Sequence, residues 1–197
     1  MHDVTAFVLS GGGSKRMGSD KALLTLRGKT LLERVLSVAR RIANTVAILG
    51  PRDRYAATGE WIIEDEYPGC GPLAGIHAAL QATETDLNVI LSVDMPFVSA
   101  DFLAWLIERA RACPSAQVVV PRVAGIVQGT CFACRRAFRS VCEQRLRLGL
   151  YRVEEAIELA APDYIEEEEV RARGLDPGIL RNLNTREDLT EAQESEP

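Results

Sequence analysis

The sequence predicts an α/β protein of the Rossmann-like, three-layer kind, in which a mostly parallel sheet carries helices on both faces. Short and almost continuously apolar runs, typical of strands buried on both sides, alternate with amphipathic segments of helical period. The first apolar run leads directly into a glycine-rich loop. In an open sheet of this class, ligands bind beyond the carboxyl ends of the strands, where this loop would lie.

The first two thirds of the chain contain the clearest elements. The helix expected over Thr30–Ala43 places its apolar residues on one face, and Thr30 with Glu33 forms a capping-box pattern at its start. A second helix is expected over 73–82, and a third follows Ser99, a suitable N-cap, and ends near Arg111. The expected strands are Thr5–Ser10, Thr45–Leu49, Trp61–Glu64, Val89–Val93 and Val118–Val120.

After about residue 122 the pattern weakens. Phe132–Arg139, Arg152–Ala160 and Arg186–Gln193 have partly helical spacing, and the run Glu166–Glu169 indicates a solvated edge. The chain has 197 residues, which favours one domain, so we expect residues 1–197 to fold together.

Composition excludes several classes. Hydrophobic residues make up 47% and charged residues 26%, which is typical of a globular protein and not of a disordered, collagenous or coiled-coil chain. The longest stretch without a charged residue, Tyr67–Thr83, contains prolines and glycines, whereas a membrane span needs about 20 mostly apolar residues. The first residues lack the basic and apolar regions of a signal peptide. Together with five cysteines that suggest no disulfide framework, this indicates a cytoplasmic protein that does not bind membranes.

The distribution of charge points to a small anionic ligand. The net charge of −5 argues against nucleic-acid binding, but residues 14–54 contain ten Lys and Arg residues against three Asp and Glu residues. Such a basic stretch suits a polyphosphate.

The glycine-rich loop is the main candidate for binding that anion. Gly11, Gly12 and Gly13 allow backbone N–H groups to approach a phosphate closely. The sequence fits neither the P-loop pattern nor the dinucleotide-binding pattern. Its distinctive feature is the pair of cations Arg16 and Lys21, which suggests a triphosphate whose leaving group must be neutralised. The structural alternative is a surface turn with incidental charge.

Four segments carry a resemblance to a known family. The loop Leu9–Lys21 resembles the signature loop of nucleotidyltransferases with a GT-A-like fold, and it is similar to that of molybdenum cofactor guanylyltransferases. Glu64–Gly75, Val93–Pro96 and Asn182–Leu189 also match that family, in the same order. The resemblance implies a fold of the nucleotide-diphospho-sugar transferase type and transfer of GMP from GTP to molybdopterin, with release of pyrophosphate.

The resemblance also assigns the catalytic residues. Asp94 closes an apolar strand, and the family implies that it binds Mg²⁺, the expected cofactor and only metal; a helix cap is the structural alternative. Arg16 and Lys21 would hold the phosphates and stabilise the departing pyrophosphate. The attacking phosphate is already an anion, so the chemistry needs no histidine base, and His77 reads as an ordinary helix residue.

The nucleotide site extends along the strand ends. The family implies that Asp65 lies near the ribose or base, although a solvated acidic turn would look the same, and that Gly71–Gly75 forms a wall of the base pocket as well as a helix entry. The nucleotide-binding set is Leu9, Ser10, Gly11, Gly12, Gly13, Lys21, Asp65, Gly71, Pro72, Leu73 and Asp94.

The acceptor site rests on Asn182 and Asn184, which are two apart and so face the same way on an extended segment. A turn before a helix capped by Thr185, with Asp188 at its third position, is the alternative, and Arg152 is a further possible phosphate contact. We expect a nucleotide-binding half over about 1–121, an acceptor-binding half over about 122–190, and a disordered tail over 191–197.

Two alternatives to the GTP-dependent function stay open: a nucleotidyltransferase using CTP or another phosphorylated acceptor, and a nucleotide-binding module without turnover. Gly11 stands where related cytidylyltransferases have Ala, which favours a purine, but Leu49–Arg52 lacks the Asn with which family members often contact guanine. We expect a monomer that makes transient contacts with cofactor-biosynthesis proteins and molybdoenzymes. Cys131 and Cys134 form a lone C-x-x-C, for which packing is the expected role.

Overall fold

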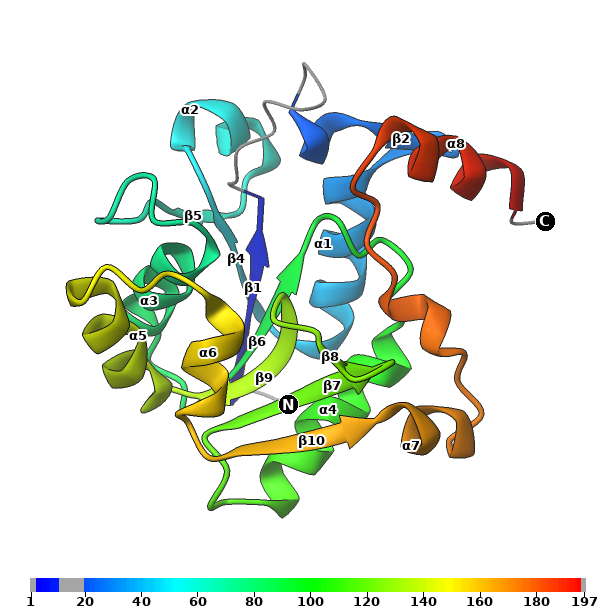
Figure 1. Cartoon of the computed structure of the whole chain (residues 1–197). Coiled ribbons are helices and arrows are strands. Elements are labelled where there is room, and N and C mark those ends of the chain that lie inside the picture. Colours follow the sequence, from blue (N-terminus) through cyan, green and yellow to red (C-terminus); the bar gives the residue numbers. More distant parts are fainter. Residues whose placement is uncertain (1–2, 11–19, 196–197) are drawn as a thin grey trace.

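A computed structural model describes residues 3–10 and 20–195 (Figure 1). Its centre is an eight-stranded sheet with the strand order β10-β7-β9-β6-β1-β4-β5, in which β8 pairs with β7. The strands are β1 (Val4–Leu9), β4 (Thr45–Leu49), β5 (Trp61–Ile63), β6 (Leu87–Ser92), β7 (Val118–Val123), β8 (Ile126–Val127), β9 (Cys131–Arg135) and β10 (Pro162–Glu166).

The sheet is mostly parallel, which confirms the predicted fold class. β1 pairs in parallel with both β4 and β6, β4 with β5, and β7 with β10. β9 is antiparallel to both of its neighbours, and β8 returns against β7. The carboxyl ends of β1, β4, β5, β6, β7 and β10 therefore meet at one edge of the sheet, since β9 reverses direction on both sides.

Helices cover both faces of the sheet (Figure 1). The alternation along β1 shows the two layers: Val4, Ala6 and Val8 belong to one core cluster, while Phe7 and Leu9 belong to the other. The first cluster includes residues of α1 (Leu31–Ile42), α4 (Ala100–Ala112), α7 (Glu167–Ala172) and η4 (Pro177–Leu180). The second includes residues of α3 (Pro72–Ala82), α5 (Phe138–Arg147) and α6 (Val153–Glu158).

The remaining elements lie near the carboxyl edge. They are η2 (Lys21–Leu23), the hairpin of β2 (Thr25–Leu26) and β3 (Lys29–Thr30), α2 (Arg52–Tyr55), η3 (Ala56–Thr58) and α8 (Arg186–Ser195). A third, small apolar cluster joins Leu26 and Leu31 to Leu183 and Ala192. The C-terminal segment is therefore held against the β2–β3 hairpin and the start of α1, far from it in sequence (Figure 1).

The predicted helix caps are confirmed. Thr30 Oγ1 accepts a hydrogen bond from the Glu33 amide at 3.1 Å, and Glu33 accepts one from the Thr30 amide at 2.7 Å. Ser99 Oγ accepts from the Phe102 amide at 3.1 Å. These side chains satisfy amide groups that the first turn of a helix leaves without partners.

Three segments differ from the expectation. Phe132–Arg135, expected to be partly helical, lies in β9, because a short apolar run buried on both sides has no period that separates strand from helix. The acidic run Glu166–Glu169 lies at the edge of the sheet and is partly exposed, as expected, but it forms regular structure: it ends the edge strand β10 and begins α7. Arg122 pairs with Glu166 and lowers the pKa of that carboxyl. Residues 191–195, expected to be disordered, continue α8, where Ala192 is buried.

Among the described helices, none combines the length and the apolar character needed to cross a lipid bilayer.

Removing the side chain of Ile90, which is fully buried in β6, will destabilise the fold that positions the site. We expect Ile90→Ala to lower the free energy of unfolding by about 2–5 kcal/mol, through lost burial and the cavity left behind. Urea denaturation measures this. The control Ile126→Ala, at a side chain that is 65% exposed, should stay within about 0.5 kcal/mol of the unmodified protein. Equal losses in the two variants would contradict the assignment of the core.

Candidate functional site

Three of the residues selected from the sequence meet at the carboxyl edge of the sheet. The Nζ atom of Lys21 lies 3.5 Å from Asp94 Oδ2 and donates a hydrogen bond to Asn184 Oδ1 at 3.3 Å. The side chains of Lys21 and Asp94 are only 15% and 23% exposed. Three segments widely separated in sequence thus place a cation, a carboxylate and an amide around one point.

Three backbone hydrogen bonds hold Asp94 and the two residues before it in place. Just before it, the Val93 amide donates to the Leu9 carbonyl at 3.0 Å and the Ser92 amide to the Thr130 carbonyl at 2.9 Å. The Asp94 carbonyl accepts from the Leu183 amide at 2.8 Å. The carboxylate therefore stands on a rigid support rather than on a free loop.

One oxygen of that carboxylate is available. Asp94 Oδ1 is buried and has no hydrogen-bond partner among the described residues. An unpartnered anionic oxygen is costly to bury, so its position favours a bound cation or donor. The described residues contain no group of three or more His, Cys, Asp or Glu side chains placed so that they could hold a metal ion together. A single carboxylate is sufficient for Mg²⁺, which commonly takes one or two carboxylates together with phosphate oxygens and water.

Lys21 is held in place by the short helix that it begins. Asp20 caps η2, accepting a hydrogen bond from the Ala22 amide at 3.1 Å, and Ala22 is fully buried. With Ala22 packed inward, the orientation of the neighbouring Lys21 is restricted. Asp20 is not among the residues predicted from the sequence, because an aspartate beside a lysine gives no signal of its own.

The end of β1 supplies support rather than free side chains. Leu9 is buried in the core, and its carbonyl is taken by Val93. Ser10 donates from both its amide and its hydroxyl to the Leu49 carbonyl, each at 3.1 Å. The other predicted residues of this loop, Gly11, Gly12, Gly13 and Arg16, lie outside the described residues.

The predicted wall of the base pocket divides into exposed and buried members. Asp65, Gly71 and Pro72 are exposed, whereas Leu73 is fully buried, so its side chain serves the core. Gly71 has φ +73° and ψ −162°, a conformation essentially restricted to glycine, and Pro72 begins α3. Neighbouring strands lie about 4.8 Å apart, which puts the end of β5, next to Asp65, about 14 Å along the edge from the end of β6.

The turn after β4 lacks the asparagine that the family often has, and its backbone donors are occupied. The Gly50 amide donates to the Ile63 carbonyl at 3.0 Å, and the Arg52 amide donates to Glu64 Oε1 at 3.0 Å. The exposed polar side chains that follow β5 here are the carboxylates of Glu64, Asp65 and Glu66. This end of the site is therefore rich in hydrogen-bond acceptors.

The two predicted acceptor residues flank a buried one. Asn182 and Asn184 are exposed on either side of Leu183, as expected for an extended segment. Asn184 contacts Lys21, so it belongs to the same centre as Asp94. The predicted cap of the next helix is present as well: Thr185 Oγ1 accepts from the Asp188 amide at 3.0 Å, and Asp188 accepts from the Thr185 amide at 2.8 Å.

Arg152, the other possible phosphate contact, is exposed and lies 3.7 Å from Glu155 in an ion pair. Glu155 also forms an ion pair with Arg145.

The cysteine pair has the predicted packing role. Cys131 and Cys134 are both buried but belong to different core clusters, on opposite faces of the sheet, so the two thiols cannot share a metal ion. Burial raises the pKa of the Cys131 thiol to about 12 and raises that of Cys134 well above its usual value. Both stay protonated and unreactive at neutral pH.

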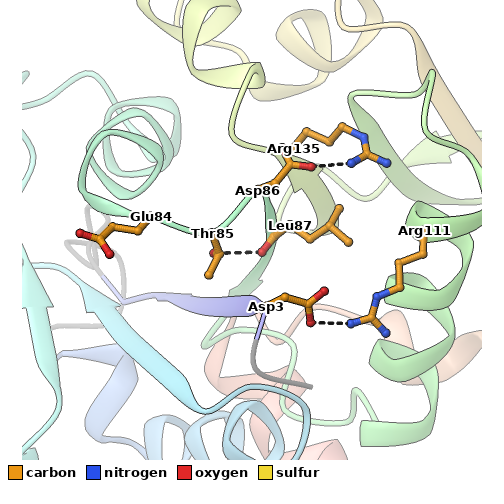
Figure 2. Close-up of a pocket in the computed structure, with 7 residues that line it drawn as sticks. All are labelled: Asp3, Glu84, Thr85, Asp86, Leu87, Arg111 and Arg135. Carbon is orange, nitrogen blue, oxygen red and sulfur yellow. Dashed lines mark hydrogen bonds and ion pairs between the residues drawn. The ribbon is translucent and has the colours of Figure 1, made fainter.

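A separate cavity of about 540 Å³ lies at the opposite edge of the sheet (Figure 2). Its arginines are already paired, Arg111 with Asp3 at 2.8 Å and Arg135 with Asp86 at 2.5 Å. The lining residues are Asp3, Glu84, Thr85, Asp86, Leu87, Arg111 and Arg135. These residues precede β1, precede or begin β6, or lie at the C-terminal ends of α4 and β9, so this cavity is not part of the site around Lys21.

A known domain family and several known proteins are similar to this chain over most of its length. Residues 6–160 match the MobA-like NTP transferase domain. A protein from Pelotomaculum thermopropionicum described as a probable molybdenum cofactor guanylyltransferase is 29% identical over 194 residues, which cover 98% of this chain and 93% of that protein. A molybdenum cofactor guanylyltransferase from Syntrophotalea carbinolica is 27% identical over 189 residues, covering 94% of this chain and 88% of the relative.

Solved structures give the same result for the fold. The molybdopterin-guanine dinucleotide biosynthesis protein A of Archaeoglobus fulgidus superposes with a TM-score of 0.82 at 25% identity, covering 97% of each chain. The 2-C-methyl-D-erythritol 4-phosphate cytidylyltransferase of Thermus thermophilus has a TM-score of 0.72 at 20% identity, covering 96% of each chain. At that identity the second structure shows the fold alone.

His77 gives a pH-dependent test of the helix that lies behind the candidate base pocket. It is buried in α3, packs edge-on against Tyr67 with ring centroids 5.6 Å apart, and neither of its nitrogens has a hydrogen-bond partner among the described residues. Burial lowers the pKa of His77. The stability due to the neutral ring is therefore fully present above the unfolded-state pKa of about 6.5 and is lost as the pH falls through the lower folded-state pKa.

We expect the free energy of unfolding to fall more steeply between about pH 7 and about pH 5 in the unmodified protein than in His77→Leu, because only the former must protonate a buried ring. Urea denaturation at both pH values measures the two slopes. Equal slopes would show that His77 titrates normally in the folded protein.

Proposed function

The chain belongs to the family of MobA-like NTP transferase domains, and we propose that it transfers GMP from GTP to molybdopterin, forming the guanine dinucleotide of the molybdenum cofactor. The family makes it a nucleotidyltransferase; the two substrates are the finer part of the proposal. Its main support is the meeting of Lys21, Asp94 and Asn184 at the carboxyl edge of the sheet. The names of the relatives favour GTP and molybdopterin over other pairs of substrates.

The proposed reaction is a displacement at phosphorus. An oxygen of the terminal phosphate of molybdopterin attacks the α-phosphorus of GTP, a new P–O bond forms, the bond to the β-phosphate oxygen breaks, and pyrophosphate leaves. The nucleophile is an anion before it attacks, so no protein base has to remove a proton. The difficulty is the approach of one anion to another, which a site overcomes by positioning and neutralisation of charge.

Asp94 is the residue that would hold Mg²⁺, through the buried oxygen that has no partner among the described residues. The ion, when bound, would neutralise charge on the phosphate oxygens. The donor set fits this ion, because one carboxylate oxygen on a rigid strand end leaves most coordination positions for phosphate and water.

Lys21 supplies the second positive charge. The side chain of Lys21 is largely shielded from solvent, and its ammonium group lies beside Asp94 and Asn184, where it would contact the phosphates of the nucleotide. A cation fixed before the reaction stabilises charge that develops on the leaving pyrophosphate without having to reorganise. Arg16, outside the described residues, is proposed from the sequence for the same task.

The acceptor would lie on the Asn184 side of this centre. Asn182 and Asn184 each offer an amide that can both donate and accept hydrogen bonds, which suits a pterin or phosphate edge. The contact between Asn184 and Lys21 would link the two substrates at the reacting phosphates.

The direct test is a product assay. Purified protein is incubated with Mg²⁺, molybdopterin and GTP, CTP or ATP in turn, and the products are weighed by mass spectrometry. We expect the guanine dinucleotide and pyrophosphate from GTP alone, and no product from Asp94→Asn. Product from CTP, or from another phosphorylated acceptor instead of molybdopterin, would favour the second candidate function. A protein that binds GTP but forms no product with any acceptor would be a binding module.

Lys21→Ala should act mainly on the chemical step. We expect kcat to fall by roughly 10²–10³, a typical loss for one group that stabilises the transition state, with a smaller change in KM for GTP. Steady-state kinetics at saturating molybdopterin measure both constants. Lys29→Ala removes an exposed lysine of β3 and serves as the control. A kcat within about twofold of the unmodified enzyme would remove Lys21 from the mechanism.

A further inference from the structure

One buried hydroxyl group connects the two described ends of the glycine-rich loop. Tyr55, the last residue of α2, is 1% exposed. Its hydroxyl donates to the Ser10 carbonyl at 3.2 Å and to Asp20 Oδ2 at 2.9 Å. Ser10 is the last described residue before the gap at 11–19, and Asp20 is the first one after it. The same oxygen therefore holds the points at which the chain leaves β1 and enters η2.

From Asp20 the connection runs directly to Lys21. While Oδ2 of Asp20 faces Tyr55, Oδ1 accepts from the Ala22 amide, and the Asp20 carbonyl accepts from the Leu23 amide at 3.1 Å. These bonds form the single turn of η2 that begins with Lys21. A shift of Asp20 would therefore move the lysine whose ammonium group lies 3.5 Å from Asp94.

The phenol group is suited to this task because it stays protonated. Burial is the main reason that the pKa of Tyr55 rises to about 12, so at neutral pH the hydroxyl keeps the proton that its two acceptors share. Arg54, one residue earlier, places its guanidinium 3.4 Å from Asp20 Oδ2 and balances the charge of the carboxylate. Two side chains, Tyr55 and Arg54, thus contact the same oxygen of Asp20.

We propose that Tyr55 is a positioning residue for nucleotidyl transfer: its hydroxyl fixes Ser10 and Asp20 relative to each other and thereby holds Lys21 against Asp94. This role rests on the proposed function of the site. Tyr55 acts through Asp20 and Lys21, with its hydroxyl occupied by protein acceptors. Loss of the hydroxyl group alone, with the buried ring kept, should therefore affect catalysis more than it affects global stability.

The first arm of the test compares Tyr55→Phe with a matched control, Tyr164→Phe. Both variants remove one oxygen and keep the ring, but Tyr164 lies on β10, where Arg122 stacks on its ring 4.1 Å from the centroid. We expect kcat to fall about tenfold in Tyr55→Phe, the effect of losing one hydrogen bond to a charged group, and to change less than about twofold in Tyr164→Phe. A kcat within about twofold of the unmodified enzyme in Tyr55→Phe would overturn the proposal.

The second arm asks whether the effect passes through Lys21. In a Lys21→Ala background, Tyr55→Phe should cost less than about twofold, since residues that act as one unit do not add their effects. A similar loss in both backgrounds would show that Tyr55 acts independently of Lys21 and would overturn the positioning role.

The third arm needs no turnover. Hydrogen exchange followed by mass spectrometry should show faster exchange in peptides covering residues 20–26 of Tyr55→Phe, because the amides of η2 lose their anchored cap. Tyr164→Phe should leave these peptides unchanged. If the unmodified protein transfers no GMP in the product assay, the proposed function fails, and this arm still decides whether Tyr55 holds η2. Unchanged exchange in Tyr55→Phe would refute that it does.

Discussion

The site depends above all on the hydrogen bonds that join the ends of two parallel strands. The Val93 amide donates to the Leu9 carbonyl, which brings Ser10 and Asp94 next to each other just beyond the sheet. Parallel strands leave the sheet on the same side, so the first loop of the chain and the aspartate after β6 must share one edge. The Leu183 amide then binds the Asp94 carbonyl and adds the C-terminal segment. Without this register, neither Lys21 nor Asn184 could reach the carboxylate.

The sequence predicted the parts of the site better than their contacts. Lys21 was selected from the charge of the glycine-rich loop, and Asp94 and Asn184 from their positions together with the family resemblance, but only the folded chain shows that one ammonium group contacts both other residues. Tyr55 and Asp20 were not selected at all. A buried hydroxyl that holds two points of a loop gives no periodic or compositional signal, because the contact joins residues that are 35 positions apart.

A similar division holds for the fold. Strands buried on both faces and helices with capping residues could be predicted from the sequence, because their signals are local. β9 was misassigned because it is short, apolar on both sides and antiparallel, and its identity depends on pairing with β6 and β7. β10 was not predicted because it contains charged residues. Arg122 of the neighbouring strand β7 pairs with Glu166 of β10, and this interaction joins residues 44 positions apart. Tertiary contacts overrode local preference in both strands.

The turn after β4 lacks the asparagine that family members often use to contact guanine, and its backbone amides do not replace it. The amides of Gly50 and Arg52 are already donating, to Ile63 and Glu64, so they cannot donate to a base. The exposed side chains that follow β5 are hydrogen-bond acceptors: Glu64, Asp65 and Glu66. Guanine, unlike adenine or cytosine, presents two adjacent donors, its N1–H group and its exocyclic amine, and the two oxygens of a carboxylate can accept from both. An acceptor-rich end of the site is therefore compatible with GTP even though the expected asparagine is absent, because base selection can rest on carboxylates in its place.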